Sequence, residues 1–161
     1  MNDTLRQALE AKGESRDYFL KHVLGMRDDQ WHFKPFAECK SAFETLQHLI
    51  IDDQSAVDSI RSGAEPDYEA YPPAEGSPEE LLLALKASHT GLLTEIESRY
   101  PNPDGTSQIC IWGSQRPFRS GVGWLSSEDF YHAGQIAFIR MATDPTWDYY
   151  NAVYGLGASG D

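Results

Sequence analysis

Hydrophobic residues recur at helical spacing in four stretches of this chain, and charged or polar residues fill the positions between them. These stretches span residues 2–24, 41–62, 77–100 and 125–142. Residues three and four positions apart share one face of a helix, so each stretch predicts an amphipathic helix with one buried stripe. Four such helices with long connections predict an all-α fold, a four-helix bundle of non-minimal topology.

Two of these helices begin with recognisable capping residues. Ser41 is followed three positions later by Glu44, a spacing in which hydroxyl and carboxylate each satisfy a free backbone amide. Ser77 precedes Pro78 and two acids, which is the preferred order at a helix N-terminus. We therefore expect the second helix to start at Ser41 and the third at Ser77.

The connections differ in character. Residues 25–40 are aromatic and predict a packed connection, whereas residues 64–76 contain three prolines and several acids and predict an exposed crossover. Residues 101–123 are rich in glycine and proline, with one β-like run at 108–112, where a small hairpin is the most that we expect. The aromatic stretch 143–150 is expected to pack over the bundle.

Length and composition are those of one ordinary globular domain. With 161 residues, 40% hydrophobic and 24% charged, the chain can bury a core without disulfides. We expect residues 1–161 to form a single domain with a frayed tail at 155–161. No apolar run reaches the ~20 residues of a membrane span, and the first residues lack signal-peptide features. We therefore expect a cytoplasmic protein with no membrane partner.

Charge and cysteine content argue against two further classes of function. The formal net charge of -12 would repel a phosphate backbone, so nucleic acid is not an expected partner. Cys39 and Cys110 lie far apart and form no Cys-x-x-Cys pair, which gives no indication of a zinc knuckle or a redox motif. We expect two free thiols, as is usual in a reducing compartment.

Candidate metal ligands stand on the second and fourth predicted helices. Glu128 and His132 are four residues apart and so share one helix face, and His48 is the third candidate. Two imidazoles and one carboxylate can hold zinc, nickel, ferrous iron or manganese, with zinc the first choice on availability. Asp52, one turn beyond His48, either orients that imidazole or becomes a fourth ligand.

Each of these residues also has a simpler explanation. His48 can be a hydrogen-bonded core histidine, Glu128 an acid in a first helical turn, and His132 a surface residue of an amphipathic helix. His89 is interpreted as a histidine at the edge of the core, although it can also face the same cavity. The sequence contains no Glu-x-x-His motif, so a carboxylate-bridged two-metal centre is not indicated.

The run His132-Ala133-Gly134-Gln135-Ile136, with His48 upstream and Arg140 downstream, resembles the DinB-like superfamily of metal-binding four-helix bundles. The resemblance spans most of the chain and implies the DinB-like topology. It implies that one divalent metal is held by a histidine of the second helix and two positions of the last. These map onto His48, position 128 and His132, where Glu128 replaces a histidine. Gln135 and Arg140 are expected to support the helix or the site from outside the ligand shell.

The same resemblance implies a function. Related proteins include thiol S-transferases that use low-molecular-weight thiols, so we expect a metal-dependent thiol S-transferase or a hydrolase acting on a small substrate, and a homodimer. The metal would lower the pKa of a bound thiol or water. The alternative is a non-catalytic dimeric bundle with a structural metal, or a binder of a small apolar ligand between Trp112, Trp124, Trp147 and tyrosines.

Overall fold

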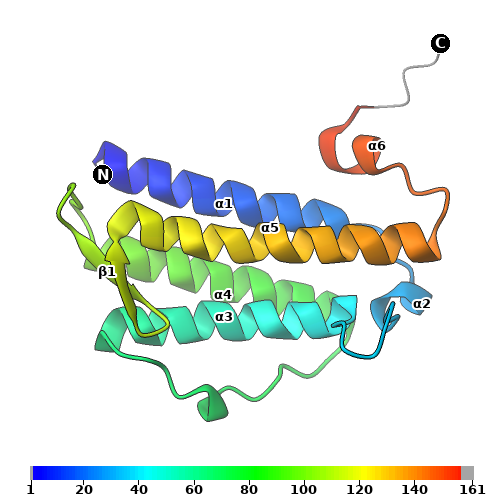
Figure 1. Ribbon diagram of the computed structural model, residues 1–161, viewed down its shortest axis with the longest axis horizontal. Helices are drawn as coiled ribbons and strands as arrows, with labels where there is room; N and C mark the ends of the chain where they lie inside the picture. The colour runs from blue at the N-terminus through cyan, green and yellow to red at the C-terminus, as the bar shows by residue number, and fades with distance from the viewer. Residues whose placement is uncertain (1, 157–161) are drawn as a thin grey trace.

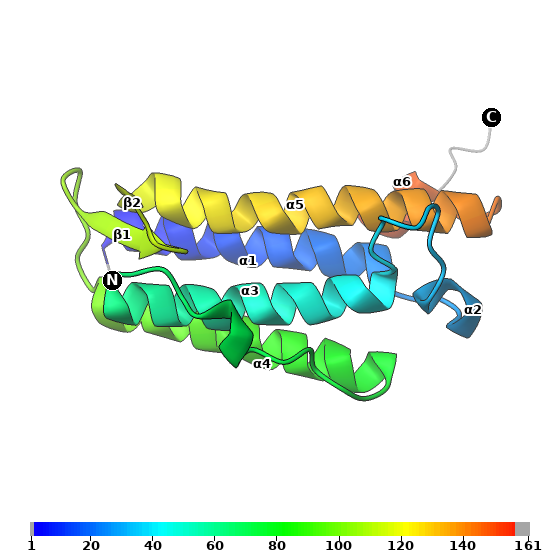
Figure 2. The same ribbon diagram turned by 60° about the horizontal axis from the view of Figure 1, so that its bottom comes forward.

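The structure, a computed structural model, describes residues 2–156 and consists mainly of four long helices that lie side by side (Figure 1). They are α1 (Asp3–Val23), α3 (Ala42–Ser62), α4 (Pro78–Arg99) and α5 (Phe118–Thr143). Helix α1 packs mainly on α5, and α3 packs mainly on α4 (Figure 2). The expected all-α four-helix bundle is therefore confirmed. Among the described helices, none combines the length and apolar composition that a membrane crossing requires.

Short elements occupy the long connections. They are α2 (Asp28–Trp31), the 3-10 turn η1 (Tyr68–Ala70), the strands β1 (Gln108–Ile111) and β2 (Ser114–Pro117), and α6 (Tyr149–Tyr154). The two strands form an antiparallel hairpin in which Ile111 pairs with Ser114 across a two-residue turn. Helix α6 packs on α1, as expected for the aromatic stretch. The tail that we expect to fray lies outside the described residues from 157 onward.

The predicted helix starts are confirmed by their capping contacts. The Ser41 hydroxyl accepts from the Glu44 amide at 3.2 Å, and the Glu44 carboxylate accepts from the Ser41 amide at 2.8 Å. Ser77 and Glu80 make the same reciprocal pair at the start of α4. Capping therefore explains Glu44, which lies outside the group of candidate ligands.

The fourth long helix begins at Phe118 and not at residue 125, so the expected boundary is wrong by two turns. The glycines of this stretch indicated a loop, but Gly121 has a packing role inside the helix. A Cβ atom at Gly121 would lie 2.3 Å from the Ile109 side chain. The glycine thus lets strand β1 pack closely on α5, and buried Phe118 and Val122 hold this first part of the helix against the core.

The bundle has two apolar core clusters and a layer of polar side chains. Along each long helix, the residues of this layer stand between those of one cluster and those of the other. The first cluster includes Phe19, Leu46, Leu49, Leu81, Leu85, Ile136 and Ile139. The second includes Leu5, Ala56, Ile60, Leu92, Ile96, Val122 and Leu125. The polar layer comprises the buried residues Lys12, Ser15, Arg16, Asp53 and Asp129, together with half-buried Ser88.

Arg16 is the centre of this layer. Its guanidinium donates to both carboxylate oxygens of Asp53 on α3, at 2.9 and 3.0 Å, and to Asp129 on α5 at 2.7 Å. The Lys12 ammonium also pairs with Asp129, and Ser88 on α4 donates to Asp53 at 2.8 Å. No charged side chain of the four is more than 3% exposed. Two cations and two carboxylates therefore compensate one another out of contact with water.

The charges of this layer support one another. Burial alone would raise the pKa of the Asp129 carboxyl, but Lys12 and Arg16 outweigh this effect and hold its pKa below the usual range. A buried carboxylate with two cationic partners and a hydroxyl donor, Ser15 at 2.7 Å, is well satisfied. Removing one partner would leave a buried charge without compensation.

We therefore expect Asp129→Asn to lower the free energy of unfolding by about 3–5 kcal/mol, because Lys12 and Arg16 lose their shared carboxylate. Urea denaturation followed by circular dichroism measures this difference. Asp17→Asn, at an exposed position of α1, is the matched control and should change stability by less than about 0.5 kcal/mol. Equal urea midpoints for the two variants would contradict this role of the layer.

Candidate metal centre

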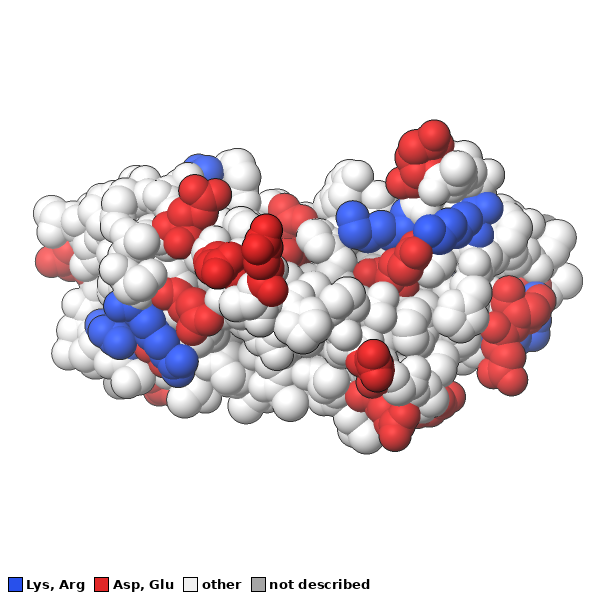
Figure 3. Space-filling view, turned by 90° about the horizontal axis from the view of Figure 1, so that it is seen from below, with Lys and Arg blue, Asp and Glu red and all other residues white. Residues whose placement is uncertain are grey.

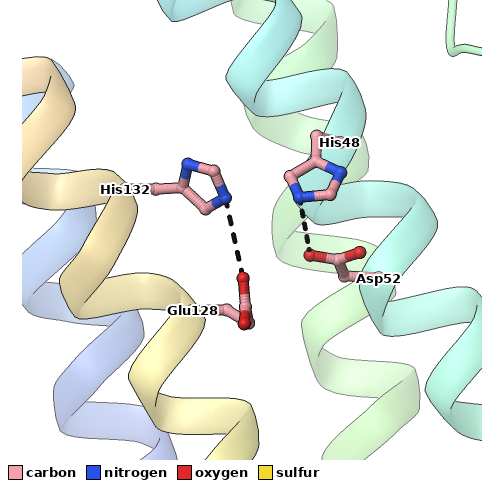
Figure 4. A group of neighbouring side chains, drawn as sticks. All are labelled: His48, Asp52, Glu128 and His132. Atoms are coloured by element: carbon pink, nitrogen blue, oxygen red, sulfur yellow. Dashed lines mark ion pairs between the residues drawn. The ribbon is translucent and has the colours of Figure 1, made fainter. Parts of the chain in front are cut away.

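Four potential metal donors converge between α3 and α5. His48 and Asp52 come from α3, and Glu128 and His132 come from α5. One ligand atom of each residue lies within 4.8 Å of one ligand atom of every other. Figure 4 shows the four side chains pointing into the space between the two helices. The structure thus brings the three sequence-derived candidates together, with Asp52 beside them, in a group that could hold a metal ion.

The buried polar layer positions both halves of this group. Asp53 follows Asp52 in the chain, and Asp129 follows Glu128, so each helix turns one acid inward and the preceding acid toward the candidate site. Arg16 contacts both inward acids and therefore fixes the rotation of α3 and α5 relative to each other. Local sequence patterns do not predict this layer, because its ion pairs join residues of different helices.

The donor separations fit a metal ion. The His48 Nε2 and Asp52 Oδ2 atoms are 3.3 Å apart, and the His132 Nε2 and Glu128 Oε2 atoms are 3.7 Å apart. In a tetrahedral shell with bonds of about 2.0–2.1 Å, neighbouring donors are separated by about 3.3 Å. Within the described residues, His132 Nε2 and Asp52 Oδ2 are buried and have no hydrogen-bond partner. Because an unsatisfied buried polar atom is costly, a cation shared by these atoms would relieve that cost.

Gln135 determines which nitrogen of His132 is free. Its amide oxygen lies 2.7 Å from His132 Nδ1. An amide oxygen only accepts, so Nδ1 carries the hydrogen and donates it. The Nε2 atom is then left with a lone pair that faces the Glu128 carboxylate, which cannot donate to it when ionised. This is the tautomer that a metal-binding imidazole needs, with its second nitrogen held by a neighbour.

Burial sets the protonation of the four groups. It lowers the pKa of His48 to about 4, with contributions from His132 and Lys40, and it also lowers the pKa of His132. Both imidazoles are therefore neutral at pH 7, the form that binds metals. Burial, and to a lesser degree repulsion from Glu128, raises the pKa of Asp52 to about 7. Burial also raises the pKa of Glu128. A divalent cation would offset the repulsion between these carboxylates.

The group opens into a cavity of about 340 Å³. Its lining consists of His48, Asp52, Tyr68, Trp112, Trp124 and Glu128. A larger cavity of about 630 Å³ has a separate lining that includes Ile50, Val57, Arg61 and Tyr71, and none of the four donors lines it. On the face seen in Figure 3, acidic side chains are spread along the length of the molecule, and basic side chains gather in a few separate places. The excess of acids favours cations near the surface.

Other residues singled out in the sequence lie elsewhere. His89 is not part of the donor group; burial, with Arg16 and Lys12 nearby, lowers its pKa to about 4. The Arg140 guanidinium donates to the Leu24 carbonyl oxygen at 2.8 Å and lies over the Trp147 ring, so both residues have a structural role away from the cavity. Cys39 and Cys110 are free thiols, as expected.

In metal-free protein, we expect His48 to stay uncharged as the pH falls from about 7.5 to about 5, and His132 to become charged only below the usual histidine pKa of about 6.5. Nitrogen-edited NMR spectra of the imidazole rings measure this and should show His132 protonated on Nδ1. For His48, the unfolded chain takes up a proton near pH 6.5 and the folded protein only near pH 4. This group therefore lowers stability as the pH falls through that window. A His48 ring that charges near pH 6.5 would contradict its burial.

Comparison with known protein families adds one finding. Residues 13–136 match the DinB superfamily, a span that covers the second half of α1, all of α3 and α4, the hairpin, and α5 through the donor group. No curated protein matches the sequence. The family match covers more than half of the chain and contains all four donors. The chain belongs to the DinB superfamily.

Proposed function

We propose that this protein binds one divalent cation between α3 and α5, with His48, Glu128 and His132 as ligands and Asp52 as a fourth donor. One observation carries the proposal: a buried imidazole nitrogen, His132 Nε2, turns its lone pair toward a carboxylate and has no hydrogen-bond partner among the described residues. Membership of the DinB superfamily supports it.

The donor set favours zinc. Two neutral imidazole nitrogens and two carboxylate oxygens suit zinc, and the separations of 3.3 and 3.7 Å are close to those of a compact four-donor shell. Nickel, ferrous iron and manganese accept the same atoms and prefer more donors, which water or substrate would supply. We propose zinc as the native metal.

We further propose that the protein is a catalyst acting on a small substrate, by thiol S-transfer or by hydrolysis. A bound divalent cation supplies Lewis-acid chemistry that lowers the pKa of a thiol or water beside it. The chain's own residues supply the rest. Gln135 keeps the His132 ring in its binding tautomer, and the cavity of about 340 Å³ admits a substrate next to the donors. Of the four donors, Asp52 would be the one that a thiol or water replaces, because a zinc shell closed by four protein ligands is typical of structural sites.

The position of the site favours catalysis over a structural metal. The helices are already joined by two apolar clusters and by the buried charged layer. The donor group lies to one side of that layer, with His48 and Glu128 about one-third exposed, at 32% and 30%. A non-catalytic dimeric bundle with a structural metal is the alternative. The homodimer stays a prediction in either case.

Calorimetric titration of metal-free protein with zinc tests metal binding. We expect one ion per chain, and an affinity that falls on the order of 100-fold or more in His132→Ala, because one of the imidazole ligands is lost. His32→Ala, which removes an exposed histidine outside the group, is the matched control and should bind zinc as the unaltered protein does. Equal zinc affinity in the two variants would rule out the proposed ligands.

Chelation separates catalysis from a structural role. If the metal is catalytic, removing it should leave the helical circular dichroism signal intact and abolish turnover with low-molecular-weight thiols. Unfolding on chelation would instead support the structural alternative. Thiol-dependent turnover that persists unchanged in His132→Ala would contradict the catalytic proposal.

A further inference from the structure

Three aromatic side chains contribute to the lining of the cavity beside the donors. Tyr68, Trp112 and Trp124 line it together with His48, Asp52 and Glu128. We propose that these three rings bind a flat, uncharged apolar group of the substrate, while its reactive end lies among the donors. The inference rests on the proposed metal-dependent function and adds to it the chemical class of the substrate.

Trp112 is held in a conformation that an L-residue rarely adopts. Its φ is 47°, the only positive φ of a non-glycine residue within residues 2–156. It occupies the first position of the two-residue hairpin turn, where Asn, Asp or Gly would be less strained. The strain is offset by contacts with α3: the indole N–H donates to Ser55 Oγ at 3.0 Å, and the Gly113 amide donates to Ser59 Oγ at 2.9 Å. The hairpin turn alone does not require a strained aromatic residue at this position, so we infer that the anchored Trp112 ring has a second role beside the donors.

The other two rings are delivered by separate elements. Trp124 stands on α5, where the Arg116 guanidinium of β2 lies 3.6 Å from its ring centre and covers one face. Tyr68 belongs to the crossover turn η1. That crossover lies close to the hairpin, since a Cβ atom on Gly113 would be 2.8 Å from the Glu65 Cβ atom. Three independent segments thus bring aromatic rings to one cavity, which a single amphipathic stripe would not do.

The exposure of the rings shows that the wall is available to a ligand. Tyr68 is 47% exposed and Trp124 is 44% exposed, so both present apolar surface beside the donors. Apolar walls with a few polar groups at one side are typical of small-molecule sites, and about 340 Å³ is at the small end of their range. The cavity therefore suits a substrate with a group about the size of one aromatic ring.

The charges of the lining determine the class of that group. Asp52 and Glu128 are the charged residues of the lining, and among the described residues no basic side chain contributes to it. A substrate tail that carries a carboxylate would find no cationic side chain in the lining, and the metal would be taken by the reactive end of the substrate. An uncharged flat tail would instead stack on the indole rings.

This inference can be tested with zinc-loaded protein and three thiols. Each thiol group is on a CH2 carbon, and the three molecules differ in the tail attached to that carbon. Benzyl mercaptan has an uncharged aromatic tail, 2-mercaptoethanol a small polar tail, and 3-mercaptopropionate an anionic tail. We expect calorimetry to show benzyl mercaptan binding about tenfold or more tightly than either of the others. In Trp112→Gly and Trp124→Ala, this preference should fall to about threefold or less, while zinc affinity is unchanged.

The variants are chosen so that the fold is kept. Glycine accepts the positive φ of position 112, and alanine suits the helical position 124. Trp147→Ala removes an indole away from the cavity and should retain the full preference. Equal affinity of zinc-loaded protein for benzyl mercaptan and 2-mercaptoethanol would overturn this inference and leave the proposed metal site standing. A preference for benzyl mercaptan that is unchanged in both Trp112→Gly and Trp124→Ala would do the same. Absence of zinc binding in the unaltered protein would overturn the proposed function, and this inference with it.

Discussion

The relation between α3 and α5 depends on the buried guanidinium of Arg16. It joins Asp53 to Asp129 across the bundle, and Lys12 and Ser88 complete the layer. Since no charge in this layer is more than 3% exposed, each must have its partner in place before the helices can close. Apolar clusters would tolerate small rotations of a helix, whereas a bidentate ion pair does not.

This constraint extends to the candidate metal centre through two acid pairs. Asp52-Asp53 and Glu128-Asp129 each place one carboxylate in the buried layer and the other in the donor group. The donors therefore do not have to bring the helices together, because Arg16 already joins α3 to α5. A site preformed in this way has little ordering entropy to lose on binding.

Much of the fold follows from local rules in the sequence, but the buried layer does not. The Ser41 and Ser77 caps and the i, i+4 pair Glu128 and His132 are short-range patterns, which explains why helix starts and donor candidates can be predicted. The start of α5 was missed because Gly121 is needed by a tertiary contact with Ile109, which no local pattern contains. The signal for the layer was present: Lys12, Arg16, Asp53 and Asp129 interrupt apolar stripes at one level of three helices. Recognising it requires knowing which helices face each other.

The central claim is that His48, Asp52, Glu128 and His132 surround one cation. Anomalous diffraction at the zinc edge from crystals of the zinc-loaded protein tests it most directly. We expect a single strong anomalous peak between α3 and α5, bounded by these four side chains. A zinc peak at any other position, or none at this one while the four side chains pair with other neighbours, would contradict it.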